Sequence, residues 1–280
     1  MAYTAEISRN NPSCILFLVD QSTSMGDHYQ SLGKPKSDAL ADVINRILQQ
    51  LVIKCAKSEG IRDYYSVGVI GYGDKGVKPA FSGNLSDKLL VPISEIANHP
   101  ARIENRTKKV PDGAGGLVEL NVKFPIWFDA VANGGTPMTA AFKEANAVIE
   151  NWLRANPYCF PPVVINITDG ESTDGDPTAE MNRLTAQSSN DGNVLLFNLH
   201  TNARSVNPLS FPGAGTILPD SYAEMLFMGA SLLPAFMRQV AAQEFGLNLN
   251  EGAKAFVLNG DIDLIISAID IGTRPSLQLR

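Results

Sequence analysis

Cysteine and histidine are scarce in this 280-residue sequence, which has three of each. Cys14, Cys55 and Cys159 lie far apart and fall in stretches patterned as strands or helices. Closely spaced cysteines mark a zinc cluster or a disulfide framework, and that spacing is missing here. We therefore expect three buried free thiols.

Long apolar runs are also absent. No run approaches the ~20 residues that a membrane-spanning helix needs. Residues 1–12 are polar and lack the basic-then-apolar order of a secretory signal. Both absences predict a cytoplasmic protein.

There is no excess of positive charge. The formal net charge is −6, whereas a sequence-independent grip on nucleic acid needs clustered lysine and arginine. One basic cluster runs from Arg102 to Lys109, and Glu104 and Asn105 interrupt it. We interpret it as the solvated face of a hairpin rather than a track for phosphates.

Strand-length apolar runs alternate with segments of helical periodicity along the chain. Strands are expected at residues 14–19, 64–72, 162–168, 194–200 and 255–258. Helices are expected at residues 38–57, 138–153, 177–188, 232–245 with an upstream extension to 222, and 261–269. The run at 14–19 is apolar on both faces, as in a central strand covered by helices. The pattern predicts an α/β fold, with a three-layer, doubly wound, mostly parallel sheet flanked by helices.

One domain accounts for nearly all of the chain. Residues 1–11 are expected to form an N-terminal tail and residues 12–280 a single domain. Within it, residues 75–125 are irregular, with short strands at 77–81 and 117–124, and are interpreted as an elaborated connection that includes a hairpin. They have too few apolar residues to bury a core of their own. Residues 247–280 are expected to form a C-terminal extension.

Three short stretches carry the same kind of side chain, hydroxyls and carboxylates. The stretch DQSTS begins at Asp20 and follows the first predicted strand, whereas TDG, centred on Asp169, ends the strand at 162–168. The stretch GGT ends at Thr136, immediately before a proline and a helix. In an open α/β sheet, ligand sites form at the carboxyl ends of neighbouring strands, so these stretches are expected to converge.

The candidate ligands are Asp20, Ser22, Ser24, Thr136 and Asp169, all hard oxygen donors that suit Mg²⁺ or Mn²⁺ better than zinc. Each stretch alone has an ordinary explanation as a strand-to-turn connection, a helix start or a turn. All three together favour a metal site. An ion held largely by neutral hydroxyls keeps uncompensated charge, so the predicted chemistry is capture of a partner's aspartate or glutamate.

These residues resemble the metal-ion-dependent adhesion site (MIDAS) of the von Willebrand factor A (VWA) domain family. The stretches LFLVDQSTSM, GGTPM and INITDGEST are similar to bacterial and intracellular members. The C-terminal stretches ILPDSYAEMLF and DIGTRPS resemble bacterial cytoplasmic members from kinase- and phosphatase-containing stress or tellurite-resistance gene clusters.

The resemblance implies a six-stranded sheet, Mg²⁺ as the ion with Mn²⁺ or Ca²⁺ as alternatives, and protein binding rather than catalysis. It implies that Ser22, Ser24 and Thr136 contact the ion, and that Asp20 and Asp169 do so directly or through water. The expected partner is a protein that presents Asp or Glu, such as a kinase, phosphatase or ATPase subunit in a stress-response or signalling assembly.

A Mg²⁺-dependent hydrolase or phosphotransferase on a similar sheet is the alternative. Asp20 at the end of a strand resembles an aspartyl nucleophile, but that chemistry requires a second carboxylate two residues later, where this chain has Ser22. There is no P-loop and no G-x-S-x-G pattern. A regulatory subunit that docks on an ATPase ring or a kinase is a third hypothesis, and it differs from the first only in its partner.

Two further features lie near the predicted site. His200 ends a predicted strand, and a structural hydrogen bond is expected for it. Glu171, Asp174 and Asp176 follow Asp169, and we interpret them as a solvated acidic turn.

Overall fold

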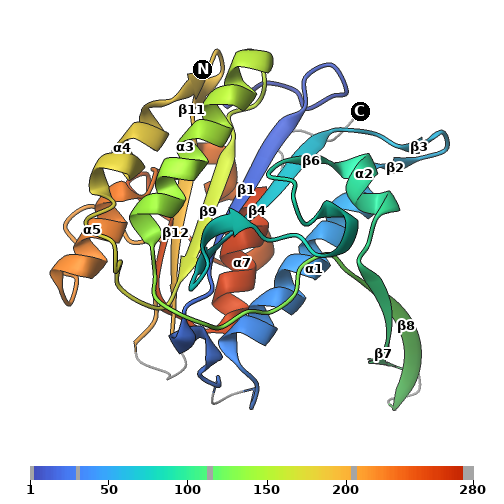
Figure 1. The fold of residues 1–280 in the computed structure, drawn as a ribbon. Helices are drawn as coiled ribbons and strands as arrows, with labels where there is room; N and C mark the ends of the chain where they lie inside the picture. The colour runs from blue at the N-terminus through green and yellow to red at the C-terminus, as the bar shows by residue number, and fades with distance from the viewer. Residues whose placement is uncertain (1–2, 30–31, 112–115, 203–206, 274–280) are drawn as a thin grey trace.

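Eight strands form the central sheet of the computed structural model, which describes residues 3–29, 32–111, 116–202 and 207–273 (Figure 1). The order across the sheet is β13-β14-β12-β9-β1-β4-β5, and β6 pairs beside β4. The strands are β1 (Ser13–Asp20), β4 (Tyr65–Gly73), β5 (Gly76–Pro79), β6 (Val91–Pro92), β9 (Val163–Thr168), β12 (Leu195–Thr201), β13 (Leu209–Ser210) and β14 (Phe256–Gly260).

The sheet is mostly parallel, as the sequence predicts. Strands β14, β12, β9, β1 and β4 run parallel to one another, whereas β13, β5 and β6 pair antiparallel with their neighbours. The resemblance implied six strands, and the two additional ones, β6 and β13, are only two residues long. Parallel strands place their carboxyl ends at one edge, so Asp20 and the residues after Thr168 meet there.

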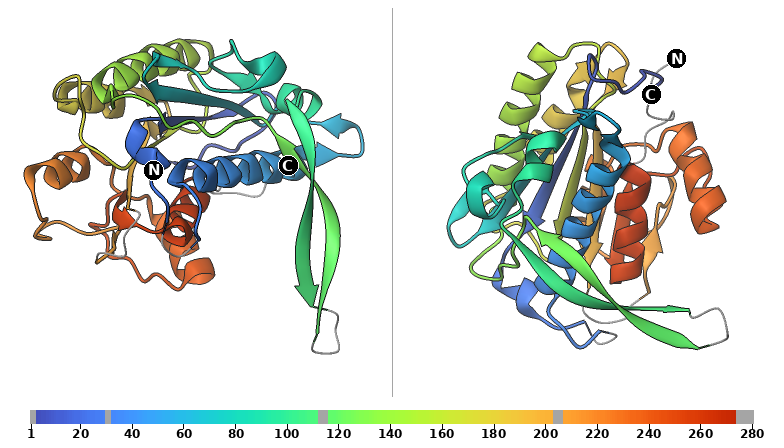
Figure 2. Two further views of the ribbon diagram at one scale, coloured as in Figure 1. Left: turned by 60° about the horizontal axis from the view of Figure 1, so that its bottom comes forward. Right: turned by 90° about the vertical axis from the view of Figure 1, so that its right-hand side faces the viewer.

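Helices cover both faces of the sheet (Figures 1 and 2). Core side chains of α1, α2, α6 and α7 pack on one face, and those of α3, α4 and α5 pack on the other. Strand β1 alternates between the two cores: Phe17 belongs to the first and Leu16 to the second, and both are fully buried. The helices are α1 (Lys36–Cys55), α2 (Ile93–Asn98), α3 (Met138–Ala155), α4 (Thr178–Ala186), α5 (Ser221–Gly229), α6 (Ala235–Phe245) and α7 (Ile262–Thr273).

A row of polar side chains crosses the second core. The Tyr72 hydroxyl on β4 donates to Asn166 Oδ1 on β9 at 2.7 Å, and Asn166 Nδ2 donates to Asn198 Oδ1 on β12 at 3.2 Å. Asn198 Nδ2 in turn donates to the carbonyl of Leu226 in α5 at 2.8 Å. All three polar side chains are completely buried, and the row satisfies them while joining three strands to one helix.

The expected single helix from 222 to 245 is wrong, because two helices occupy this stretch. Between α5 and α6, Ser231 donates its N–H to the carbonyl of Leu196, and Leu232 forms a β-bridge with Lys254. Pro234 then precedes α6, where its fixed φ suits a helix start. An apolar periodicity that spans both helices hides the break.

The ends of α1 also differ from the prediction. The helix was expected at 38–57, but it begins at Lys36, directly after Pro35, and has no side-chain cap. It ends at Cys55, two residues early, because the short antiparallel pair β2 (Ala56–Lys57) and β3 (Gly60–Ile61) follows.

The connection at residues 75–125 is more ordered than expected. It contains the 3-10 turn η2 (Gly83–Leu85), α2, and a long two-stranded hairpin of β7 (Arg102–Pro111) and β8 (Leu117–Ile126). The hairpin projects away from the body of the molecule (Figures 1 and 2). Its strand β8 was expected, whereas β7 was interpreted only as a charged hairpin face.

Two small features complete the described structure. The 3-10 turn η1 (Thr23–Gly26) follows β1, and a short hairpin pairs β10 (Ser188–Ser189) with β11 (Gly192–Asn193). Across the described residues, every helix is too short or too polar to cross a membrane. The end of the stretch DIGTRPS and the rest of the chain from residue 274 lie outside the described residues.

Candidate metal centre

Asp20 is the last residue of β1 and is almost fully buried. Its Oδ1 accepts a hydrogen bond from the backbone N–H of Ser22 at 2.8 Å, and its Oδ2 accepts one from the Thr168 hydroxyl at 2.7 Å. Burial raises the pKa of the Asp20 carboxyl, and the hydrogen bonds from Ser22 and Thr168 oppose that rise. Both oxygens are thus fixed in direction at the carboxyl end of the sheet.

The turn after Asp20 presents the two serine hydroxyls. Ser22 precedes η1, and Met25 inside η1 is completely buried, which anchors the turn against the core. Ser22 Oγ and Ser24 Oγ lie 3.1 Å apart. Ser24 Oγ also donates to Asp169 Oδ1 at 2.7 Å, so the first and third sequence stretches are in direct contact.

Thr136 joins the same group of loops. The backbone N–H of Thr136 donates to Thr173 Oγ1, and the backbone N–H of Thr173 donates to the carbonyl of Thr136, both at 2.9 Å. A Cβ on Gly170 would lie 3.9 Å from Thr136 Oγ1. The Thr136 hydroxyl therefore lies beside the loop that carries Asp169, as expected.

Gly134 explains why this loop begins with glycine. Its φ is +85°, and a Cβ there would lie 2.4 Å from the backbone of Asp74. Its carbonyl accepts the N–H of Thr23 at 3.0 Å, and its own N–H donates to Thr23 Oγ1 at 3.0 Å. Any larger residue would collide with the backbone of Asp74 and displace the loop that carries Thr136.

Lys36 is the site residue that sequence reasoning missed. Its ammonium contacts Asp169 Oδ2 directly, and it lies 3.9 Å from Asp27 Oδ2. The side chains of Lys36 and Asp169 are only 5% and 1% exposed, so this is a buried ion pair. The sequence offered no signal for it, because the expected helix began at residue 38, whereas in the structure Lys36 opens α1.

His200 on β12 and Tyr222 on α5 hydrogen-bond to the backbone of the loop that carries Asp169. His200 Nδ1 accepts the backbone N–H of Asn259 at 3.2 Å, and the ring also hydrogen-bonds the backbone of Asp169. Burial lowers the pKa of His200, which keeps the ring neutral near pH 7. The expected structural role of His200 is confirmed. Tyr222 of α5 donates its hydroxyl to the carbonyl of Gly170 and so joins α5 to the same loop.

The acidic turn after Asp169 is more than a solvated loop. Asp174 accepts backbone N–H groups of Thr139 and Ala140, each at 2.9 Å, in the first turn of α3. Although burial raises the pKa of Asp174, these hydrogen bonds outweigh it and lower the pKa below its usual value. Asp174 therefore caps the helix that follows Thr136 and fixes where that helix begins.

The five predicted ligands are all oxygen donors, the type that a hard divalent ion such as Mg²⁺ prefers. Side-chain hydrogen bonds join Ser22, Ser24 and Asp169, the backbone N–H of Ser22 donates to Asp20, and Thr136 Oγ1 lies beside Gly170. Within the described residues there is no group of three or more His, Cys, Asp or Glu suited to a metal. A site made here would therefore depend on hydroxyl ligands, and the positive charge now beside Asp169 is that of Lys36.

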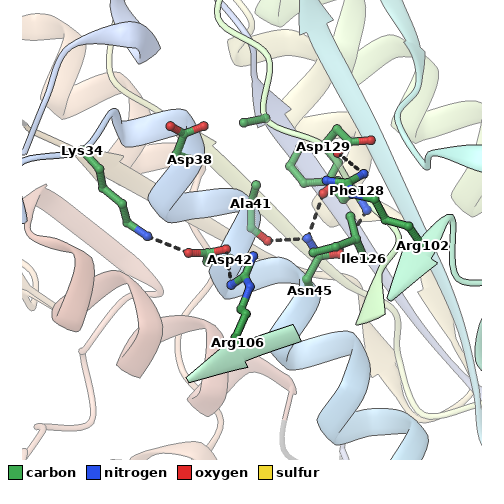
Figure 3. A pocket seen from close by; sticks show the side chains of 11 residues that line it. Lys34, Asp38, Ala41, Asp42, Asn45, Arg102, Arg106, Ile126, Phe128 and Asp129 are labelled. Atoms are coloured by element: carbon green, nitrogen blue, oxygen red, sulfur yellow. Dashed lines mark hydrogen bonds and ion pairs between the residues drawn. The ribbon is translucent and has the colours of Figure 1, made fainter. Parts of the chain in front are cut away.

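A polar cavity of about 450 Å³ lies beside the exposed face of α1 (Figure 3). Asp42 on α1 accepts from Lys34 at 2.6 Å and from Arg106 of β7 at 2.7 Å. Arg102 pairs with Asp129 at 2.7 Å. These ion pairs fasten the root of the β7–β8 hairpin to the body, and the cavity is separate from the five predicted metal ligands.

No protein-family model matches the sequence, and no curated protein matches it. Among solved structures, similarity is found to the pilus adhesin SpaC from Lactobacillus rhamnosus GG, with 12% identity and a TM-score of 0.48, covering 93% of this chain and 30% of that one. VWA2, an ArnB paralog from Sulfolobus acidocaldarius, has 10% identity and a TM-score of 0.35, covering 68% of this chain and 35% of its own.

A third similar structure is the vWF domain of a type V pili tip protein from Porphyromonas gingivalis. It has 16% identity and a TM-score of 0.30, covering 58% of this chain and 39% of that one. This chain thus spans between 30% and 39% of the length of these three solved chains.

Proposed function

We propose that this protein is a metal-dependent protein-interaction module of the VWA type and not an enzyme. The observation that supports the proposal is that the three loops carrying Asp20, Thr136 and Asp169 contact one another at the carboxyl edge of the sheet. Ser24 is central because its hydroxyl lies within hydrogen-bond reach of both Ser22 and Asp169.

Mg²⁺ is the proposed ion, with Mn²⁺ or Ca²⁺ as alternatives. Ser22, Ser24 and Thr136 would supply neutral hydroxyls, and Asp20 and Asp169 would supply negative charge directly or through water. The ion would supply a positive centre that attracts a carboxylate of a partner protein, because hydroxyl ligands leave much of its charge uncompensated. The hydrogen bonds to both oxygens of Asp20 would keep the Asp20 carboxylate in a fixed orientation.

Lys36 has a definite part in this proposal. Its ammonium balances the charge of Asp169, so the loops stay together without an ion. A divalent ion that binds Asp169 through the oxygen facing Lys36 has to compete with that ammonium. The lysine would therefore weaken metal binding while keeping the empty site assembled.

A catalytic role has less support. Both oxygens of Asp20 already accept hydrogen bonds, and the position two residues later is a serine rather than the acid that phosphotransfer chemistry requires. We propose that the partner is a protein that presents Asp or Glu, with a kinase, phosphatase or ATPase subunit as the candidate. A bacterial stress-response or signalling assembly and a cytoplasmic location are part of the same proposal.

Direct metal titration tests the proposal. Isothermal calorimetry with Mg²⁺ and Mn²⁺ should give one site in the wild type, and Ser22→Ala should weaken binding by at least about tenfold, equal to about 1.4 kcal/mol. Ser172→Ala is the matched control, because Ser172 lies on the Asp169 loop but donates to Asp174 instead. It should bind metal like the wild type.

Two results would contradict the proposal. The first is a wild-type protein that binds neither ion at millimolar concentration. The second is phosphatase or ATPase turnover that disappears in Asp20→Ala, which would favour the hydrolase alternative.

A further inference from the structure

The β7–β8 hairpin leaves a row of apolar side chains uncovered. On β8, Val118, Leu120 and Val122 are 43%, 49% and 36% exposed, and Leu117 next to them is 67% exposed. Within the described part of the chain, β7 and β8 pair only with each other, so the outer edge of β8 has no neighbouring strand. A two-stranded ribbon is marginally stable alone, and a free apolar edge is a template for another strand.

The side chains along β8 are complementary to a second copy of the same strand. Two β8 strands can pair antiparallel about a two-fold axis that passes through Asn121 of both copies. Glu119 of each copy then lies opposite Lys123 of the other. The same alignment places Leu120 opposite Val122 and Val118 opposite Phe124, so apolar residues meet on one face.

The charges select this alignment over its neighbours. A shift of the two-fold axis by one residue in either direction pairs Asn121 with Glu119 or with Lys123, and no acid then faces a base. Glu119 also has an interaction within its own chain. A carboxylate has about four lone-pair sites and can accept a second cation.

We propose that β8 is a homodimerisation strand, and that two copies of this chain join through it into a four-stranded antiparallel ribbon. Strand β8 suits this role better than β7. Arg102 and Arg106 of β7 pair with Asp129 and Asp42 at the root of the hairpin (Figure 3). Residues 117–123 of β8, in contrast, are all exposed. The ribbon extends beyond the body, which leaves room for a second copy (Figure 2).

Charge reversal and its repair test the alignment. Sedimentation velocity across a concentration series should show a monomer–dimer equilibrium for the full chain. Glu119→Lys should weaken the dimer by about tenfold, because two favourable pairs become two repulsive ones. The double variant Glu119→Lys with Lys123→Glu recreates both pairs in reverse and should recover the wild-type affinity. A wild type that stays monomeric throughout, or a double variant no better than the single one, overturns the proposal.

A cysteine at the two-fold axis tests the strand itself. The Cα atoms of residues facing each other in an antiparallel ladder lie about 4.5–5.5 Å apart, within disulfide range. Asn121→Cys should therefore form a disulfide-linked dimer on mild oxidation. The chain's own three cysteines are buried and should not interfere.

Thr107→Cys is the matched control, because Thr107 lies opposite Asn121 within the hairpin and is equally exposed. In the proposed ribbon, the two Thr107 positions are three strand spacings apart, or about 14 Å, which is too far for a disulfide. Cross-linking of the control but not of Asn121→Cys would place the contact on β7 and overturn the assignment to β8.

Discussion

Single charges decide how the proposed metal centre behaves. Asp169 is 1% exposed, and a carboxylate so deeply buried needs a positive partner or strong donors. Ser24 supplies one donor and Lys36 supplies the charge. Removing the cation of a buried ion pair leaves the carboxylate without a compensating charge, and a different cation can restore that compensation.

Lys36→Met should therefore have two opposite effects. In the presence of EDTA, the free energy of unfolding of the variant should be about 3 kcal/mol lower than that of the wild type, because Asp169 loses its counter-charge. In Mg²⁺ or Mn²⁺, most of that loss should be recovered, and the apparent metal affinity should rise by about tenfold, equal to about 1.4 kcal/mol. Urea unfolding in EDTA and in metal, with calorimetric titration, measures both effects.

Lys34→Met provides the comparison for this variant. Lys34 lies two residues earlier and pairs with Asp42, and the two side chains are 38% and 27% exposed, so the loss of Lys34 should cost less than 1 kcal/mol. Its metal affinity should match that of the wild type. Equal metal affinities of Lys36→Met and the wild type would contradict the proposal that Lys36 competes with the ion for Asp169.

The sequence was informative about the ligands and silent about their counter-charge. Asp20 and Asp169 could be placed together because each follows a buried run in a parallel sheet. The ammonium of Lys36 reaches Asp169 from α1, 133 positions away in sequence. Such a long-range pairing has no periodicity that could reveal it, and the predicted helix began at residue 38, after Lys36.

At the scale of elements, the hairpin and α1 form one unit. Asn45 in α1 accepts the N–H groups of Trp127 and Phe128 at 2.8 and 3.0 Å, just after β8 ends. Arg106 of β7 reaches Asp42, one turn earlier in α1, and also stacks 3.9 Å from the centre of the Phe124 ring. Polar contacts to α1 thus hold the root of the hairpin, together with the Arg102–Asp129 ion pair.

Asp42→Asn should show a pH-dependent loss of stability. Burial raises the pKa of Asp42, but the hydrogen bonds and charges of Lys34 and Arg106 outweigh it and lower the pKa below its usual value. Because the pKa of Asp42 is lower in the folded state than in the unfolded state, its ionised form stabilises the fold. This stabilisation is fully present at a pH above the unfolded-state pKa of about 3.9, and it is lost as the pH falls through the folded-state pKa. The variant should lose about 0.5–1 kcal/mol at pH 7 and progressively less below pH ~4.

Urea unfolding of the wild type and variant from pH 7 to pH 3 measures this difference. Asp38→Asn, one turn earlier on α1 and beside the same cavity, serves as the control and should change stability little. A difference between wild type and Asp42→Asn that stays constant down to pH 3 would contradict the ion-pair explanation.

Element boundaries were where sequence reasoning failed. The apolar periodicity at 222–245 continues through the break between α5 and α6, because both helices face the sheet while the residues between them pair with Leu196 and Lys254. Strand β7 was missed for a different reason. Only its partner β8 makes it a strand, and its alternating charges predict a solvated surface equally well.

On the scale of the whole molecule, the metal centre is separate from what holds the fold together. Two apolar cores, one on each face of the sheet, contain the large buried side chains. The candidate ligands lie at one edge of the sheet, at strand ends and in loops. Because parallel strands alternate with helices throughout, the overall architecture was the part most securely predicted from sequence.

The protein should therefore keep its fold without divalent ions. In EDTA, thermal unfolding should remain a single cooperative transition at nearly the same temperature as in untreated protein. At an Mg²⁺ concentration about 100 times its dissociation constant, stability should rise by about 2.7 kcal/mol. Differential scanning calorimetry measures both quantities, and unfolding caused by the chelator alone would make the ion structural rather than functional.

The buried polar row from Tyr72 through Asn166 and Asn198 has a consequence for how the strands find their partners during folding. A misalignment of β9 or β12 by one residue would turn its asparagine amide to the opposite face, where the core is formed by apolar side chains such as Phe17 and Ile165. Each buried polar group left without a hydrogen-bond partner costs about 1–3 kcal/mol, so a sheet with this misalignment is less stable than the native one. Tyr72, Asn166 and Asn198 thereby favour the native register of β4, β9 and β12.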